Sequence, residues 1–198
     1  MIYGNRVLAV IPARGGSKRA PRKNILPFRG KPLFLWSVIA ADNSRYIDAT
    51  VLSTEDREIA QLAKYYAVPV LDRPSELGGD TASNEDVLRH ALSVFPGYGW
   101  IVLLQPTSPL RTTEDIDACL NMAQLTATCI SYRPDGTKNG AVYVANVEWI
   151  AKHDFSEPTA RYTMPFERSL DIDHLEDFHG FAESELPHQR TEVRRNAA

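Results

Sequence analysis

Short apolar runs alternate with helically spaced apolar residues along the chain as far as Tyr132. The runs are continuous and end at turn-forming residues, which is typical of buried strands; they cover residues 6–11, 49–53, 68–71, 100–105 and 126–132. Apolar side chains at helical spacing lie between them, in residues 33–41, 55–67, 83–95 and 112–125. This alternation predicts an α/β fold with a mostly parallel sheet and helices on both of its faces.

The rest of the chain is less regular. It contains a turn at 133–136, a strand at 140–146, a short helix at 147–151 and an acidic stretch at 170–178. No linker or internal repeat divides the sequence, so we predict a single domain over residues 1–187. Residues 188–198 have no apolar period, and we predict that they form a flexible tail.

Charge and cysteine content narrow the range of functions. The 198 residues carry a formal net charge of −3, so a general nucleic-acid-binding surface is not expected. Cys119 and Cys129 lack the spacing of a metal or redox pair, and we expect buried free thiols in a reducing compartment. No apolar run approaches the roughly twenty residues of a membrane helix. We therefore expect a cytoplasmic protein that binds neither nucleic acid nor membranes.

The loop after the first predicted strand is strongly basic. In IPARGGSKRAPRKN, residues 11–24, five of the fourteen residues are Lys or Arg, and such a cluster of like charge favours an anion among its side chains. Gly15 and Gly16 allow backbone N–H groups to approach a phosphate closely, while Arg14 offers forked contacts and Lys18 or Lys23 a point charge. A triphosphate fits this set, and the alternative is a solvated basic loop without a ligand.

Two acidic residues near the end of the predicted domain form a second candidate. In LDIDHLEDF, Asp171 and Asp173 are two positions apart, so in an extended segment both carboxylates point the same way while Ile172 faces the core. Two such carboxylates together with substrate phosphates suit Mg²⁺, and Asp177 is a candidate supporting group. The alternative is an ordinary helix start, with acidic residues in its first turn.

The segment LLQPTSPLR is the third candidate. Its strand ends at Gln105, and Pro106 and Pro109 stiffen the following loop, so that Thr107, Ser108 and Arg111 are held in a rigid polar segment able to line a pocket. The alternative is a plain connection to a helix capped by Thr112 or Thr113. The histidines and serines show no nucleophile arrangement, so phosphoryl or nucleotidyl transfer by positioning and charge is the chemistry that remains.

Six segments of the sequence resemble those of the acylneuraminate cytidylyltransferases, the CMP-sialic acid synthetases. They are IPARGGSKRAPRKN, STED, RPSELGGDTAS, LLQPTSPLR, NGAVY and DIDHLEDF, in that order and within residues 6–180. The resemblance implies a Rossmann-like fold of the nucleotide-diphospho-sugar transferase type, with Mg²⁺ as cofactor. It implies activation of a nine-carbon acidic sugar by CTP for cell-surface polysaccharides, through attack of the anomeric hydroxyl on the α-phosphate and release of pyrophosphate.

The same resemblance implies roles for individual residues. The triphosphate would lie against Arg14, Gly16, Ser17, Lys23 and Asn24, and the cytidine against Ala13, Arg73, Ala82 and Asn84. The sugar would lie against Gln105 and Tyr143, whose amide and phenol can pair with hydroxyl and N-acyl groups. Asp171 and Asp173 would hold the metal; with Arg14 and Lys23 they are the predicted catalytic residues. The general base stays open between a metal-activated hydroxyl and a carboxylate such as Asp173.

The chain departs from the family pattern at two places, and the smaller departure is Asn84, which stands where a serine is common. Family members carry a long excursion that supplies basic side chains for the sugar carboxylate and much of a dimer interface, whereas this chain has a short segment near 132–139. Arg133 and Lys138 are the two candidates to replace the missing charges, and a homodimer stays an open question. Two alternative functions follow: a CTP-binding homologue with impaired turnover, and a cytidylyltransferase for a different acidic sugar.

Overall fold

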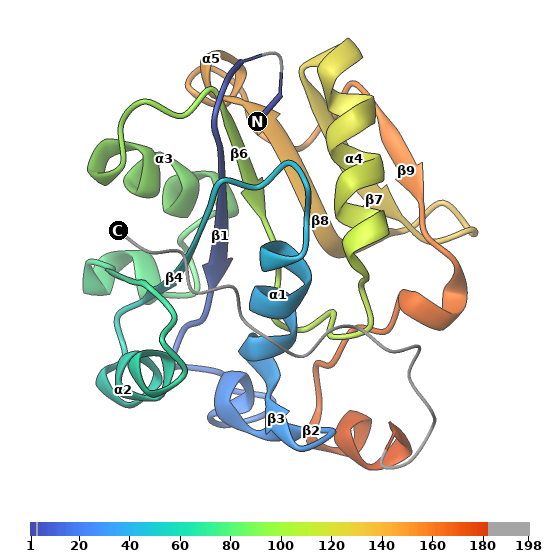
Figure 1. The fold of residues 1–198 in the computed structure, drawn as a ribbon. Helices are drawn as coiled ribbons and strands as arrows, with labels where there is room; N and C mark the ends of the chain where they lie inside the picture. Colours follow the sequence, from blue (N-terminus) through green and yellow to red (C-terminus); the bar gives the residue numbers. More distant parts are fainter. Residues whose placement is uncertain (3, 182–198) are drawn as a thin grey trace.

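A seven-stranded mixed sheet forms the centre of the molecule in the computed structural model, which describes residues 1–2 and 4–181 (Figure 1). The strand order is β5, β4, β1, β6, β8, β7, β9. The bounds are β1 Val7–Pro12, β4 Ala49–Thr54, β5 Val70–Asp72, β6 Trp100–Leu103, β7 Thr128–Tyr132, β8 Lys138–Asn146 and β9 Arg161–Thr163. Strand β8 runs antiparallel to β6 and β7, and the other neighbouring strands are parallel.

Helices cover both faces of this sheet, as predicted. Their bounds are α1 Leu33–Asp42, α2 Arg57–Tyr65, α3 Asn84–Val94, α4 Thr113–Thr126 and α5 Val147–Ile150. Most buried apolar residues of α1 and those of α2 and α4 belong to one core cluster, and those of α3 and α5 belong to the cluster on the opposite face. Leu33 and Trp36 of α1 belong to a third cluster, with Phe28 and Ile172. The predicted mostly parallel α/β fold is therefore confirmed, and its sandwich of layers buries the sheet on both sides.

Local sequence signals explain where the main helices begin. The Asp56 side chain accepts hydrogen bonds from the backbone N–H groups of Glu58 and Ile59 and caps α2. Ser83 and Asp86 form a reciprocal capping box at α3. Thr112 and Asp115 form another at α4. Each cap satisfies donors of the first helical turn that otherwise lack partners, so these side chains fix the register of the loops that precede the helices.

The carboxyl ends of β1, β4 and β6 meet at one end of the sheet, where the smaller elements also gather (Figure 1). These elements are the hairpin β2–β3, with β2 at Pro27–Phe28 and β3 at Lys31–Pro32, and the 3-10 helices η1 Lys23–Ile25 and η4 Leu175–Phe181. Two further 3-10 helices are η2 Ser75–Gly78 and η3 Phe166–Arg168. Ligands of such sheets bind beyond the carboxyl ends of the strands, so we expect the functional site among these loops.

Strand β8 is irregular at its start. While β7 advances from Ile130 to Tyr132, the paired positions on β8 run from Tyr143 back to Lys138, so extra residues bulge out between them. Gly140 lies within this bulge at a φ of 70°, in the left-handed region that favours glycine. A bulge redirects the side chains on either side of it, and this one changes the face to which the start of β8 points.

Three smaller predictions concern the cysteines, membrane-spanning helices and the tail. Cys119 and Cys129 are buried free thiols, as expected. No helix in the described ranges is long and apolar enough to cross a membrane. The predicted tail at 188–198 and the last residues of the predicted domain lie outside the described residues, so the tail stays a prediction.

Candidate active site

A cleft of about 330 Å³ opens at the carboxyl end of the sheet, and we call it the first cleft. It brings together residues from the loops after β1, β5 and β6 and from the acidic segment 171–173. The residues that line it are Pro12, Arg14, Lys23, Asn24, Arg73, Leu77, Gly79, Asp80, Ala82, Ser83, Asn84, Val87, Gln105, Pro106, Thr107, Asp171 and Asp173. Nine of the predicted site residues are in this set: Arg14, Lys23, Asn24, Arg73, Ala82, Asn84, Gln105, Asp171 and Asp173.

The basic loop on one side of the cleft is neutralised by carboxylates. Arg14 and Lys18 both pair with Asp80, at 2.9 and 2.6 Å. Arg19 and Lys23 both pair with Asp173, at 2.6 and 2.9 Å. These pairs lie at or near the surface, where an ion pair adds little stability, so an incoming polyanion can replace the carboxylates at small cost.

The two glycines of the loop have different surroundings. The backbone N–H of Gly15 donates to the Glu55 carboxylate at 2.8 Å, so this group already has an anionic partner within the protein. A Cβ at Gly15 would lie 2.3 Å from Asp56 Oδ2, so the close approach that requires glycine here is to Asp56. Gly16 has open space around it.

Glu55 also anchors a residue predicted to contact the nucleotide. It accepts hydrogen bonds from Arg73 Nε at 3.2 Å and Nη2 at 2.5 Å, and Arg73 is only 5% exposed. Burial alone raises the pKa of Glu55, but the bonds from Arg73 and from the Gly15 N–H outweigh it and lower the pKa. Glu55 is therefore ionised at neutral pH and holds the basic loop to the Arg73 segment.

Asp171 and Asp173 face the cleft, and Ile172 between them is fully buried, as the extended reading predicts. The alternative, a helix start in this segment, is also present just after the acidic pair, where η4 begins. Asp177 accepts hydrogen bonds from the backbone N–H groups of Asp173 and His174, at 2.8 and 2.7 Å. Asp177 therefore organises the backbone that follows Asp173, in line with its expected supporting position.

The Asp171 carboxylate has an unused acceptor. Its Oδ1 is buried and has no hydrogen-bond partner among the described residues. Burial raises the pKa of Asp171, and the Asp173 carboxylate also raises it, against a lowering bond from Thr107. A cation beside Oδ1 would relieve both effects, so the donor set fits a divalent metal with two carboxylates from the protein. No group of three or more metal-binding side chains exists within the described ranges, so phosphate or water would supply the other ligands.

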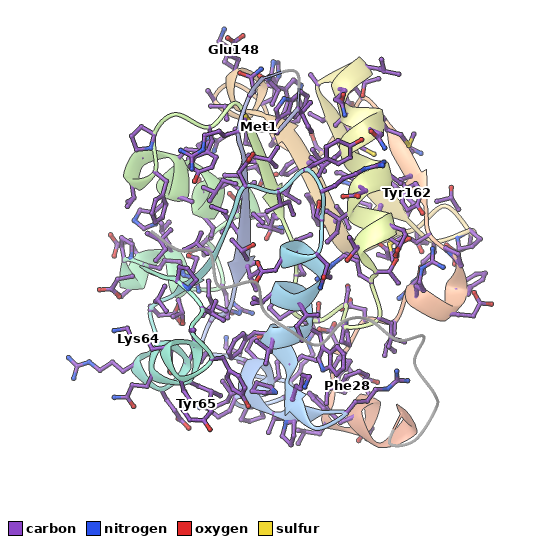
Figure 2. The ribbon with its side chains drawn as sticks, in the orientation of Figure 1. Met1, Phe28, Lys64, Tyr65, Glu148 and Tyr162 are labelled. Carbon is purple, nitrogen blue, oxygen red and sulfur yellow. The ribbon has the colours of Figure 1, made fainter. Side chains whose placement is uncertain are left out.

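A buried charge network fixes the segment that leads to Asp171. Asp115, fully buried on α4, accepts two hydrogen bonds from Arg168, from Nε at 2.9 Å and Nη2 at 2.7 Å. The Tyr162 hydroxyl donates to the same carboxylate at 2.9 Å, and Figure 2 shows Tyr162 on β9 beside α4. Because Arg168 is three residues before Asp171, this network determines where the acidic pair lies.

The Gln105 loop is held by a buried arginine. Arg111 is 1% exposed and donates to the carbonyls of Gln105 at 3.2 Å and Ala141 at 2.8 Å, and to Ser37 Oγ at 2.6 Å. Burial lowers its pKa to about 10, so it stays charged at neutral pH. The expected rigid loop is present and Thr107 lines the cleft, but Ser108 and Arg111 are buried inside the fold.

Gln105 and Tyr143, the predicted sugar-binding pair, meet at Gly140. A Cβ at Gly140 would lie 2.4 Å from Gln105 Oε1 and 3.8 Å from the Tyr143 hydroxyl. The pKa of Tyr143 rises to about 12 because the phenol is buried and faces the charges of Glu85 and Asp171. Tyr143 is thus a neutral hydrogen-bond donor at physiological pH.

A second cleft of about 560 Å³ adjoins the first and shares Ser83 and Asn84 with it. Tyr143 lines the second cleft, together with Glu85, Arg89, Lys138, Lys152, His153, Asp154, Phe155 and Ser156. Gln105 and Tyr143 therefore open onto different clefts, with Gly140 between them.

Three predicted residues do not line either cleft, and several others were missed. Ala13 is fully buried behind the first cleft, while Gly16 and Ser17 lie on the outer part of the basic loop. The sequence interpretation missed Asp80 and Glu55, although both belong to segments that carry the resemblance. Their acidic character next to basic site residues was the available signal.

The fold and the first cleft define an α/β protein with a charged cleft at the carboxyl end of its sheet. The chain belongs to the cytidylyltransferase family, whose sequence model, described as "Cytidylyltransferase", matches residues 8–179. The N-acylneuraminate cytidylyltransferase of Escherichia coli O18:K1:H7 is 31% identical over 211 residues, covering 87% of this chain and 50% of that protein. This chain thus spans about half the length of that relative.

Two further comparisons agree with this assignment. The CMP-N,N'-diacetyllegionaminic acid synthase of Legionella pneumophila is 31% identical over 212 residues, covering 85% of this chain and 91% of that protein. A solved structure of CMP:2-keto-3-deoxy-manno-octonic acid synthetase complexed with CTP superposes with a TM-score of 0.74 at 13% identity, over 89% of this chain and 96% of that one. The structural likeness confirms the fold.

Proposed function

We propose that this protein is a CMP-nonulosonate synthetase, which transfers the cytidylyl group of CTP to a nine-carbon acidic sugar and releases pyrophosphate. One observation carries the proposal: Arg14 and Lys23 of the basic loop line the first cleft together with the Asp171–Asp173 pair, and Lys23 contacts Asp173 directly. Cations and an acidic pair in one cleft suit a triphosphate with its metal ion. The names of the relatives support an acidic sugar as the acceptor.

The side chains of the first cleft have separate tasks in this mechanism. Arg14 and Lys23 bind the phosphates and stabilise the negative charge that grows on the α-phosphate as the bond to pyrophosphate breaks. Arg73, Ala82 and Asn84 contact the cytidine side of the nucleotide, and Gln105 orients the acceptor. Holding the sugar hydroxyl next to the α-phosphate supplies much of the rate enhancement, since no protein nucleophile is required.

Mg²⁺ is the proposed metal, and Asp171 and Asp173 are its proposed protein ligands. When bound, it would neutralise phosphate charge and lower the pKa of a coordinated hydroxyl. CTP would take over Lys23 and Arg19 from Asp173, and this exchange would free the carboxylate for the cation. Binding of CTP and metal is therefore mutually favourable by reciprocal linkage. The buried free thiols and the use of CTP suit a cytoplasmic reaction.

Pyrophosphate release measured with CTP, Mg²⁺ and a panel of acidic sugars tests the proposal. The panel contains N-acetylneuraminic acid, N,N'-diacetyllegionaminic acid and an eight-carbon acidic sugar. We expect release with at least one nine-carbon acceptor and formation of the matching CMP-sugar. CTP binding without release from any acceptor would instead identify a nucleotide-binding homologue that lacks turnover, and release with the eight-carbon sugar alone would assign a different acceptor.

A further inference from the structure

Glu55 and Asp56 directly follow β4 and do not contact the substrates in the proposed mechanism. They border a separate hollow beside α2, and neither lines the first cleft. Their side chains are only 19% and 20% exposed. Asp80 and Asp173, which pair with the same basic loop inside the cleft, are 51% and 36% exposed. A ligand in the first cleft would therefore displace Asp80 and Asp173 and leave the Glu55–Asp56 pair in place.

The two carboxylates hold opposite ends of the basic loop. At the start of the loop, the Gly15 N–H donates to Glu55 at 2.8 Å. At its end, Arg22 donates from Nη1 to Asp56 Oδ2 at 2.6 Å and from Nη2 to Oδ1 at 3.2 Å. Gly15 also lies against Asp56, since a Cβ at Gly15 would be 2.3 Å from Oδ2. The start and the end of the loop therefore meet at one dipeptide.

Arg22 has an unfavourable backbone conformation. Its φ is 61°, in the left-handed region, where a residue with a Cβ is disfavoured. Such a conformation persists where surrounding contacts fix it, and Arg22 bonds to both Asp56 and Glu58. Burial raises the pKa of Asp56, but the bonds from Arg22 and from the Ile59 N–H outweigh it, so the carboxylate is ionised at neutral pH. The pair therefore fixes the backbone that carries Lys23, the next residue, into the first cleft.

Both carboxylates are tied to other elements as well. Asp56 caps α2 through Oδ1. Glu55 accepts from Arg73 Nε at 3.2 Å and Nη2 at 2.5 Å, and Arg73 lines the first cleft. The segment after Arg73 also passes close to this carboxylate, since a Cβ at Gly78 would lie 2.6 Å from Glu55 Cδ. The dipeptide thus joins the basic loop to α2 and to the Arg73 segment.

We propose that Glu55 and Asp56 are positioning residues, which clamp both ends of the basic loop before the nucleotide binds and keep its cations in register with Arg73. This inference rests on the proposed function. A loop that is ordered in advance loses little conformational entropy when the triphosphate binds, so more of the contact free energy appears as affinity. Glu55 acts on the loop and on Arg73, whereas Asp56 acts on the loop alone.

Calorimetric titration of CTP into Asp56→Asn and Glu55→Gln tests the clamp. Charge alone predicts that the loss of a carboxylate near a polyanion tightens binding. The clamp predicts the opposite: we expect the Kd for CTP to rise about tenfold in each variant, because the loop must then be ordered on binding. Asparagine is as good a helix cap as aspartate, so the melting temperature of Asp56→Asn should stay close to that of the wild type. Glu114→Gln, an exposed change on α4, is the control and should leave the Kd unchanged.

Fragments of the nucleotide separate the two residues. Tripolyphosphate should compete with CTP less well in both variants, and cytidine less well in Glu55→Gln alone, since Glu55 is the residue that holds Arg73. In steady-state kinetics the KM for CTP should rise while the KM for the acidic sugar stays unchanged. A variant that merely folds less well would instead lower kcat at constant KM. Equal competition by cytidine in Glu55→Gln and in the wild type overturns the link to Arg73.

Trypsin provides a test without a ligand, because residues 14–23 contain five Lys or Arg residues. Release of the loop in Asp56→Asn should speed cleavage there several-fold, whereas Glu114→Gln should be cleaved like the wild type. Unchanged or tighter CTP binding in either clamp variant overturns the inference, and so does equal cleavage. If the wild type binds CTP but releases no pyrophosphate with any acceptor, the proposed function fails separately and the titrations still decide. If the wild type binds no CTP, the cleavage rates of the ligand-free chains decide.

Discussion

The two clefts differ in how their cations are balanced. In the first cleft Arg14 and Lys23 pair with carboxylates, whereas in the second Lys138 is bound to a backbone carbonyl. The first arrangement keeps a dense basic loop folded without its ligand, and a ligand must displace the carboxylates. In the second, Lys138 has no ion pair among the described residues, although the carboxylates Glu85 and Asp154 line the same cleft. The two clefts therefore hold their cations in different ways.

The largest expected effect comes from removing the metal-binding charge. Asp171→Asn should lower the rate of pyrophosphate release about a hundredfold or more and raise the metal concentration required, because transition-state charge loses its counter-ion. The melting temperature should not fall, since Asp171 is a buried carboxylate beside another carboxylate. Asp135→Asn, an exposed change on the tip of the β7–β8 turn, is the control. A metal titration identical to that of wild type would remove Asp171 from the site.

The next effect concerns Asp115, whose bonds to Arg168 hold the segment that leads to Asp171. Asp115→Asn should destabilise the protein by about 2–3 kcal/mol, at or just below the usual cost of breaking a buried pair because Arg168 is partly exposed. Urea unfolding measures this, with Glu114→Gln, an exposed change on the same helix turn, as the control. Equal loss of stability in both variants would show that the Asp115–Arg168 pair contributes no more to the free energy of unfolding than an exposed charge on α4.

The same carboxylate predicts a pH dependence. Burial raises the pKa of Asp115, but the bonds from Arg168 and the Thr112 N–H outweigh it, so the pKa in the folded state lies below its ordinary value. The stabilisation is therefore complete above the unfolded pKa near 4 and is lost as the pH falls below it. Unfolding free energies across this range should decline less steeply in Asp115→Asn than in wild type.

A smaller effect tests the proposed role of Arg14 in binding the phosphates. Arg14→Ala should lower turnover about tenfold, because one charge that stabilises the transition state is lost. Single-turnover kinetics with saturating CTP measure the chemical step. Arg57→Ala, on α2, provides a matched loss of an exposed arginine. Unchanged single-turnover rates in Arg14→Ala would place the residue outside the reaction.

The smallest effect is the most direct test of the comparison between the clefts. Asp80→Asn releases Arg14 and Lys18 from their shared carboxylate and should tighten CTP binding a few-fold, since exposed ion pairs are weak. Calorimetry at low salt measures the affinity, and added salt should reduce the difference. Weaker CTP binding in this variant would mean that Asp80 helps to bind the nucleotide.

Local patterns in the sequence were enough to predict most of the fold. Helix starts at Ser83 and Thr112 and the alternation around Ile172 depend on residues a few positions apart, and the structure confirms them. The antiparallel direction of β8 and its bulge depend on pairing with distant strands, which no local pattern encodes. The burial of Arg111 was missed for the same reason: its partners Ser37 and Ala141 come from distant segments.

The candidate site was predictable as a set of residues but not as two cavities. The first cleft collects nine of the predicted residues, because they follow strands whose ends meet. The sequence could not show that Lys138 lines the second cleft while Arg133 lines neither cleft, since this depends on which way the bulge turns the strand. Asp80 and Glu55 were missed although their acidic character next to basic site residues was visible, because the ion pairs that show their role join distant segments.

The bulge at Gly140 has a practical meaning for protein engineering. A library that varies the second cleft can randomise Lys152, which is exposed, whereas Lys138 also holds the carbonyl of the buried Phe155 at 2.7 Å. Position 140 should stay fixed, because any Cβ there would meet both an unfavourable backbone conformation and the amide of Gln105. Gly140 thus has to be kept, while exposed positions around the second cleft can be varied.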